Sequence, residues 1–143
     1  MLTVIFFIVF EDKLFSKSDA RELVEEQGFK MTDDFELLNN ESSSAIGDYY
    51  HTFTLKISEH DKQQAIQKIK RSRDYHKSQD VIDNLPYKYD RYYGPKIYWN
   101  YENSFSYVRE YYQPSGHKGY APTFRRISIN KSNNELTFED IDE

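Results

Sequence analysis

The chain has 143 residues, of which 38% are hydrophobic and 30% are charged, a balance typical of one globular domain with a well-solvated surface. No apolar run approaches the roughly 20 residues of a membrane span, and the lack of cysteine excludes disulfides and thiolate metal sites. We therefore expect a cytoplasmic, intracellular protein without membrane attachment. Abundant Phe, Tyr, Ile, Asn and Lys with few Gly and Pro are typical of an A/T-rich genome, such as a low-GC bacterium, phage, mobile element or large DNA virus.

Charge is distributed unevenly along the chain. Residues 1–67 carry six basic and thirteen acidic side chains, whereas residues 68–131 carry thirteen basic and six acidic ones. Residues 132–143 carry five acidic side chains and no basic one. A basic middle therefore lies between two acidic ends, and the aromatic run Tyr87–Tyr112 falls inside it.

The N-terminal elements are a strand and a helix. Leu2–Phe10 is rich in β-branched and aromatic residues, which predicts a strand buried on both faces. Ser16 or Ser18 can cap a helix that follows, and Gly28 is placed to end it in a left-handed turn. The apolar stripe of this helix is short and regularly spaced.

A second group of elements extends to residue 77. Phe29–Leu38 is a weaker strand candidate, and the polar stretch Asn39–Asp48 is typical of a mobile loop. Tyr49–Ile57 alternates between apolar and polar positions, as a half-buried strand does. Ser58 then opens a helix predicted over Glu59–Lys77, with its buried side marked by Ala65, Ile66 and Ile69.

The order β-α-β-β-α predicts an α+β protein with a ferredoxin-like start. Lys96–Tyr101 is the best candidate for a fourth strand, and Ser106–Tyr112 for the next. Thr123–Asn130 and Glu135–Ile141 predict a hairpin, preceded by the turn-rich loop Gln113–Pro122. The C-terminal half is therefore expected to be a β-hairpin-rich elaboration.

We interpret residues 1–143 as one domain with three regions. Residues 1–80 form the β-α-β-β-α core, and residues 81–131 form a tyrosine-rich basic β region. Residues 132–143 form an acidic final strand or tail.

The motifs of known catalytic sites are missing from this sequence. His51 begins "HTFT", but two-histidine phosphoesterases need two His-x-Thr/Ser copies, and the chain has neither a second copy nor Thr or Ser at Phe53. We expect His51 to lie on the polar face of its strand. There is no G-x-S-x-G and no phosphate-binding glycine loop. The sequence favours a non-enzymatic protein with no catalytic residues and no cofactor; an enzyme with an unrecognised histidine site, drawn from His51, His60, His76 and His117, is the third possibility.

Metal ligands are equally sparse. Glu59, His60 and Asp61 are adjacent on a helix, so we expect their side chains to diverge. The C-terminal acids are better explained as a solvated acidic tail than as a cation site. The sequence therefore predicts no metal site.

The run Tyr87–Tyr112 holds nine of the thirteen tyrosines and the only tryptophan. Alternation in its strands places aromatics on both faces, and since a small domain has one core, we expect some of them to be exposed or to cover an edge. The predicted binding residues are Tyr89, Arg91, Tyr93, Lys96, Tyr98, Trp99, Tyr101, Tyr107, Arg109, Tyr111, Arg125 and Arg126. A secondary basic patch is predicted at Lys68, Lys70, Arg71 and Arg73.

Two functional hypotheses follow from this region. In the first, the chain is a small interaction protein whose Tyr, Trp and Arg side chains contact a protein partner or a second copy of itself, because such residues dominate interfaces. In the alternative, bases of single-stranded nucleic acid or a nucleotide stack on the tyrosines while Arg and Lys neutralise phosphates.

Overall fold

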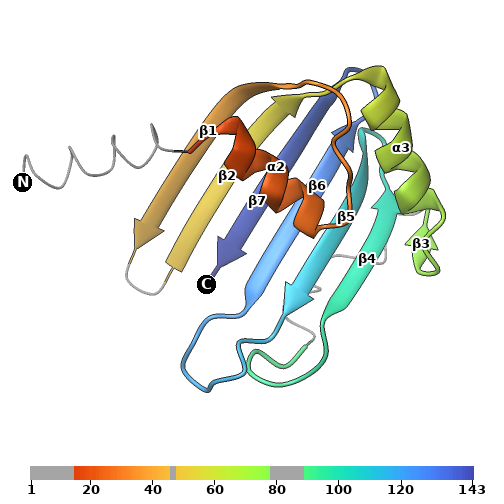
Figure 1. Ribbon diagram of the computed structural model, residues 1–143. Coiled ribbons are helices and arrows are strands. Elements are labelled where there is room, and N and C mark those ends of the chain that lie inside the picture. The colour runs from red at the N-terminus through yellow and green to blue at the C-terminus, as the bar shows by residue number, and fades with distance from the viewer. Residues whose placement is uncertain (1–14, 46–47, 78–88) are drawn as a thin grey trace, which may run out of the picture.

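The computed structural model describes residues 15–45, 48–77 and 89–143. Within them, one seven-stranded sheet carries both helices on the same face (Figure 1). The helices are α2 (Lys17–Glu26) and α3 (Glu59–Lys70). The strands are β1 (Glu36–Ala45), β2 (Asp48–Lys56), β3 (Tyr75–His76), β4 (Ile97–Glu102), β5 (Ser106–Gln113), β6 (Thr123–Asn130) and β7 (Glu135–Asp142). The protein is thus α+β, as the sequence predicts.

The strand order is β1-β2-β7-β6-β5-β4-β3, and every neighbouring pair is antiparallel except β3 with β4. The final strand β7 therefore lies between β2 and β6, so the first and last parts of the described chain share one sheet. This order does not confirm a ferredoxin-like topology, and the strand predicted at Leu2–Phe10 lies outside the described residues.

Both helices begin where the sequence indicates. The Ser16 side chain accepts a hydrogen bond from the Asp19 N–H while Asp19 reaches back to the Ser16 N–H, a complete capping box. Gly28 has φ +91°, in the left-handed region that favours glycine after a helix. At α3, Ser58 caps the N–H of Asp61. Neither helix is long and apolar enough to cross a membrane, so no candidate span is found among the described residues.

Two boundaries differ from the prediction. The helix expected to reach Lys77 ends at Lys70, because Tyr75–His76 leaves the helix to pair with β4. The loop expected over Asn39–Asp48 is wrong, since Glu36–Ala45 is a continuous strand paired with β2. As an edge strand with mostly exposed side chains, β1 needs no apolar alternation, so a hydrophobic pattern does not reveal it.

The main core lies between the sheet and the two helices. The rings of Phe53 and Phe138 stack 4.8 Å apart at its centre, and Val24 and Ile69 pack into it from the helices. We call this side of the sheet the helix face. His51 points to it beside Phe53 and is 6% exposed, so its predicted place on the polar face is wrong.

The acidic C-terminal residues form a strand and not a solvated tail. Asp140 is 8% exposed on the helix face, opposite Arg125 of β6. Glu139 alternates to the other side of the sheet, where it meets Arg126. The apolar residues on either side of these acids, Phe138 and Ile141, pack into the two cores and fix the strand in the sheet, so the acids lie in partly buried positions.

Candidate functional site: a cationic cleft and a tyrosine-rich sheet end

The aromatic residues of β4 and β5 are divided between the two faces of the sheet. Trp99 and Tyr101 point away from the helices and are 8% and 7% exposed, so the structure buries two of the predicted contact residues. Trp99 packs there with Tyr112 and Phe124 as a second, smaller core. The expected exposure of some of these aromatics therefore holds for Tyr98, which is 43% exposed on the helix face, and not for Trp99 and Tyr101.

This second core contains a compensated charge network. The Glu110 carboxylate, 1% exposed, accepts a hydrogen bond from the Tyr101 hydroxyl at 2.6 Å and from Arg126 Nε at 3.2 Å. Arg126 also lies 3.4 Å from Glu139. Burial acts against the charge of Arg126, but Glu110 and Glu139 outweigh it and raise its pKa. Arg126, a predicted binding residue, is thus partly buried and held between two carboxylates.

On the helix face, Arg109 lies in a different environment. Its guanidinium donates to Asn100 Oδ1 at 2.7 Å, to the Gln27 carbonyl at 2.9 Å and to Ser72 Oγ at 3.0 Å. It also lies 4.9 Å from the ring centroid of Phe29. All three acceptors are neutral, and no carboxylate of the described residues lies within ion-pair distance of this side chain. Burial lowers the pKa of Arg109, which is 9% exposed.

Arg109 forms the floor of an open cleft between α3 and the end of α2. A cavity of about 580 Å³ is lined by His60, Gln63, Gln64, Gln67, Lys68, Arg71, Ser72 and Arg109. A neighbouring cavity of about 360 Å³ shares Lys68, Ser72 and Arg109, and its other lining residues are Glu26, Gln27, Gly28, Tyr98 and Asn100. The Glu26 carboxylate at its edge is paired with Arg125 at 3.0 Å. We call these two cavities together the cationic cleft. Two residues of the predicted basic patch, Lys68 and Arg71, line the cationic cleft. The ammonium group of Lys70 instead lies over the ring of Tyr107, and Arg73 is exposed outside the cleft.

A second candidate surface lies at the end of the sheet where β4 begins and β5 ends. Two loops, residues 89–96 and 114–122, run side by side there (Figure 1). They are joined by backbone hydrogen bonds from the Ser115 N–H to the Arg91 carbonyl at 3.0 Å and from the Gly116 N–H to the Tyr92 carbonyl at 2.7 Å. We call this the tyrosine-rich end, because Tyr89, Tyr93 and Tyr120 are 39%, 63% and 69% exposed on it.

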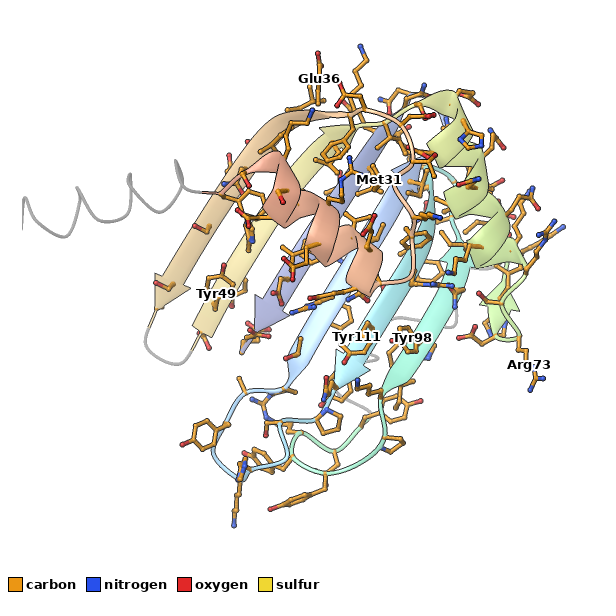
Figure 2. All side chains as sticks on the ribbon, in the orientation of Figure 1. Met31, Glu36, Tyr49, Arg73, Tyr98 and Tyr111 are labelled. Atoms are coloured by element: carbon orange, nitrogen blue, oxygen red, sulfur yellow. The ribbon has the colours of Figure 1, made fainter. Side chains whose placement is uncertain are left out.

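The remaining predicted contact residues fall near these two surfaces. Tyr98 and Tyr111 are paired across β4 and β5 on the helix face, with ring centroids 5.1 Å apart (Figure 2). Tyr98 is 43% exposed, but Tyr111 is buried. Lys96 is exposed on the tyrosine-rich end, where Arg91 also lies and donates to the Glu143 carbonyl. Arg125 instead pairs with Glu26 at 3.0 Å and Asp140 at 3.6 Å.

Comparison with known proteins adds nothing to this geometry. No family model, curated protein or solved structure matches this chain.

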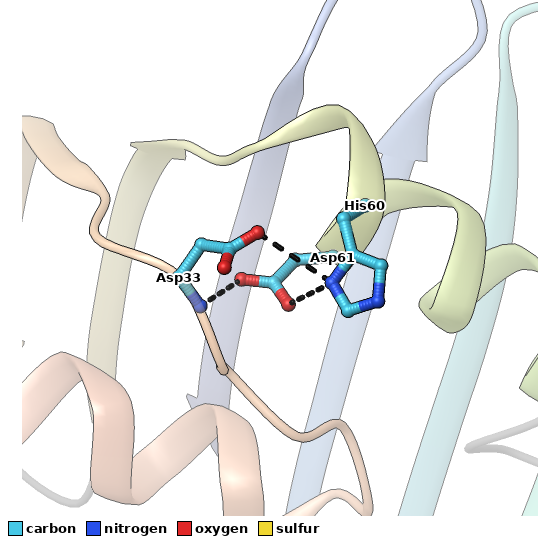
Figure 3. A group of neighbouring side chains, drawn as sticks. All are labelled: Asp33, His60 and Asp61. Carbon is cyan, nitrogen blue, oxygen red and sulfur yellow. Dashed lines mark hydrogen bonds and ion pairs between the residues drawn. The ribbon is translucent and has the colours of Figure 1, made fainter.

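One cluster contradicts the expected divergence of adjacent side chains on α3. His60 Nδ1 lies 3.5 Å from Asp33 and 3.7 Å from Asp61 (Figure 3). The potential ligand atoms of these three residues all lie within 4.8 Å of one another, close enough to hold a metal ion. Side chains diverge along a helix, but here the first turn of α3 meets the chain that precedes β1. Glu59 does diverge and bonds Gln63 instead.

The hydrogen bonds of Asp61 explain this cluster without a metal. Its carboxylate accepts bonds from the Thr32 N–H at 3.1 Å, the Thr32 hydroxyl at 2.6 Å and the Asp33 N–H at 2.9 Å. Burial acts to raise the pKa of Asp61, but these hydrogen bonds outweigh the effect of burial, so the pKa lies below its ordinary value. Asp61 thus fastens the chain between α2 and β1 to the start of α3.

Sequence reasoning missed the neutral residues that shape the cationic cleft. Gln27, Ser72 and Asn100 come from three separate segments, and each orients Arg109. No local pattern links them. The spacing of Gln63 and Gln67 on one side of α3 could have indicated a polar lining.

Proposed function

We propose that this protein is a small non-enzymatic interaction protein that contacts an acidic protein partner through its tyrosine-rich end. The observation that carries the proposal is the exposure of Tyr89, Tyr93 and Tyr120 on two joined loops. Tyrosine offers a large, rigid contact area at low entropic cost, and small residues such as Ser and Gly around it adapt to a partner. Residues 114–122 contain such small residues, Ser115, Gly116 and Gly119.

The loops are held in place before any partner arrives. The Asp90 carboxylate accepts hydrogen bonds from the N–H groups of Tyr92 and Tyr93 at 2.8 and 2.9 Å. The ring of Tyr89 packs 5.5 Å from Trp99, which ties the loop to the buried core of the opposite face. Preorganised side chains lose less conformational entropy on binding, so they support tighter binding for the same contact area.

Charge favours an acidic partner. Arg91, Lys96 and Lys118 lie on the two loops, whereas Asp90 is their single acidic residue and its carboxylate is occupied by backbone N–H groups. These charges favour encounter with a negative surface and give salt-dependent association. The acidic N-terminal half of a second copy is one such surface.

The test compares the double variant Tyr93→Ala/Tyr120→Ala with the wild-type protein. Sedimentation measures self-association, and affinity purification from the native host measures a stoichiometric partner. Phe105→Ala is the matched control, because Phe105 is 75% exposed but lies in the β4–β5 turn at the opposite end of the sheet. Loss of association in the double variant alone supports the proposal, and a strictly monomeric wild type without a partner contradicts it.

Single-stranded nucleic acid is the alternative partner for the same surface, since exposed tyrosines can stack on bases. It predicts binding of a labelled oligonucleotide that weakens steeply as salt increases. If the oligonucleotide binds at low salt and the double variant loses that binding, nucleic acid replaces protein as the partner.

A further inference from the structure

We propose that the cationic cleft is a binding site for a phosphate-bearing small molecule of about mononucleotide size. This proposal is independent of the tyrosine-rich end, because the cleft lies on the helix face between α2 and α3. At its centre is Arg109, whose position is fixed by hydrogen bonds and whose charge has no ion-pair partner among residues 15–45, 48–77 and 89–143.

Arg109 is oriented by its surroundings but not neutralised by them. Its three neutral acceptors take three of the five N–H bonds that a guanidinium offers, which leaves donors for a ligand. The charge of Asp74 acts on Arg109 at longer range, and the Asp74 carboxylate instead bonds the Asn100 amide at 2.9 Å. Asn100 therefore links the two groups and holds the guanidinium towards the cleft.

The ammonium group of Lys68 lies at the same point of the cleft as the Arg109 guanidinium. A Cβ atom at Gly28 would lie 3.1 Å from Arg109 Nη1 and 3.2 Å from Lys68 Nζ, so both cationic groups border one point beside the glycine backbone. Arg71 lines the same cavity one turn further along the chain. Like charges this close repel one another, and an anion between them removes that repulsion.

The α2 terminus explains part of this arrangement. Arg109 donates to the Gln27 carbonyl at the end of α2, where a cation is favoured by the helix dipole. That interaction accounts for one guanidinium. It does not account for Lys68 and Arg71, which have no ion pair in the described part of the chain and border an open cavity.

The remaining lining indicates the size and chemistry of the ligand. A cavity of about 580 Å³ falls within the range of small-molecule sites. Gln63, Gln64 and Gln67 supply amides that both donate and accept, suited to a polar ring or sugar next to the phosphate. Tyr98, 43% exposed, offers an aromatic surface in the neighbouring cavity. The cationic groups suit the phosphate itself, since Arg binds it through parallel hydrogen bonds and Lys as a point charge.

The experiment is a calorimetric titration at low ionic strength with ADP, adenosine and inorganic phosphate, supported by thermal unfolding in each ligand. We expect ADP to bind at least about tenfold more tightly than adenosine, and phosphate to raise the unfolding temperature more than chloride at equal ionic strength. A twelve-nucleotide single strand is titrated in parallel. If the strand binds and ADP does not, or if no phosphate compound binds, the proposal is overturned.

The variants locate the site. Lys68→Gln/Arg71→Gln removes two exposed cations of the cleft, and we expect it to weaken ADP binding at least about tenfold while leaving the unfolding temperature without ligand unchanged. Arg73→Gln/Lys77→Gln is the matched control, since it removes the same charge from exposed positions outside the cleft. Equal loss in both double variants, or no loss in the first, contradicts a site at the cleft.

Discussion

Two arginines on neighbouring strands face opposite sides of one sheet and have opposite electrostatic surroundings. Arg126 of β6 lies between the carboxylates of Glu110 and Glu139, which raise its pKa. Arg109 of β5 is bound by three neutral acceptors, and burial lowers its pKa. The comparison separates a cation that serves the fold from a cation that is left available to a ligand, although both residues look alike in the sequence.

The largest expected effect on stability is at Glu110, whose carboxylate neutralises Arg126. Glu110→Ala removes the partner of Arg126 and the acceptor of Tyr101, and it leaves a partly buried cation with only Glu139 beside it. We expect the free energy of unfolding to fall by about 3–5 kcal/mol. Urea denaturation measures it.

Glu139→Ala is the control for that variant. Glu139 lies 3.4 Å from Arg126 but is 29% exposed at its side chain, so water can take its place. We expect a loss of about 1 kcal/mol or less. Equal losses in the two variants would mean that the burial of Glu110 does not decide its contribution.

Arg109→Met tests the other side of the comparison. The variant removes a buried charge without leaving a carboxylate behind, and its three former acceptors border the cleft, where water can bond them. We expect unfolding to become easier by about 1–3 kcal/mol, less than for Glu110→Ala. Stabilisation by added phosphate should vanish in the same urea titration. A loss as large as that of Glu110→Ala would show that Arg109 serves mainly the fold.

The alternation of these strands could be predicted from the sequence, but the role of each face could not. Period-two spacing correctly separates Arg109 and Tyr111 from Glu110 and Tyr112. It says nothing about what covers each face, so it could not predict that Trp99 and Tyr101 are buried on one face while Tyr98 is exposed on the other. Whether a face is covered depends on contacts between distant segments, such as the packing of Tyr89 on Trp99.

The helices show the same limit of prediction from sequence, because their starts could be predicted but the end of α3 could not. Caps are local, so Ser16 and Ser58 located both helix starts correctly. The end of α3 depends on the pairing of Tyr75 with Asn100, a contact across 25 positions of chain, and no cap marks it in the sequence. The cleft has the same origin, because Arg109 meets Gln27 and Ser72 only in the folded protein.

Gly28→Ala tests whether the backbone beside Arg109 contributes to the cationic cleft. The φ of +91° strains any L side chain, and the new Cβ would crowd Arg109 Nη1 at 3.1 Å. Gly116→Ala is the control, because its φ of +81° is also positive but nothing lies within 4 Å of its Cβ position. Both should lose about 1–2 kcal/mol from backbone strain. Only Gly28→Ala should also weaken phosphate binding in calorimetry, and an unchanged affinity would remove Gly28 from the site.

A third arginine extends the comparison to a site with excess acid. Arg125 lies on the helix face with Glu26, Asp140 and Asp142, and burial together with the charge of Asp140 raises the pKa of Asp142 to about 6. Where Arg109 has too few carboxylates, Arg125 has more than one cation can neutralise. This excess should appear as a dependence of stability on pH.

The direction in which stability changes with pH follows from the protons bound by the folded and unfolded chains. Between the ordinary pKa of 3.8 and the folded pKa of about 6, folded Asp142 holds its proton more tightly than the unfolded chain does. Stability is therefore greatest at the low end of this range and falls as pH rises through 6. Carboxylates with lowered pKa, such as Asp61, act in the opposite direction but only below their ordinary range. Asp142→Asn should therefore gain about 1 kcal/mol at pH 7 and flatten the curve of unfolding temperature between pH 5 and 7. Wild-type stability that increases from pH 5 to 7 would show instead that Arg125 neutralises both aspartates.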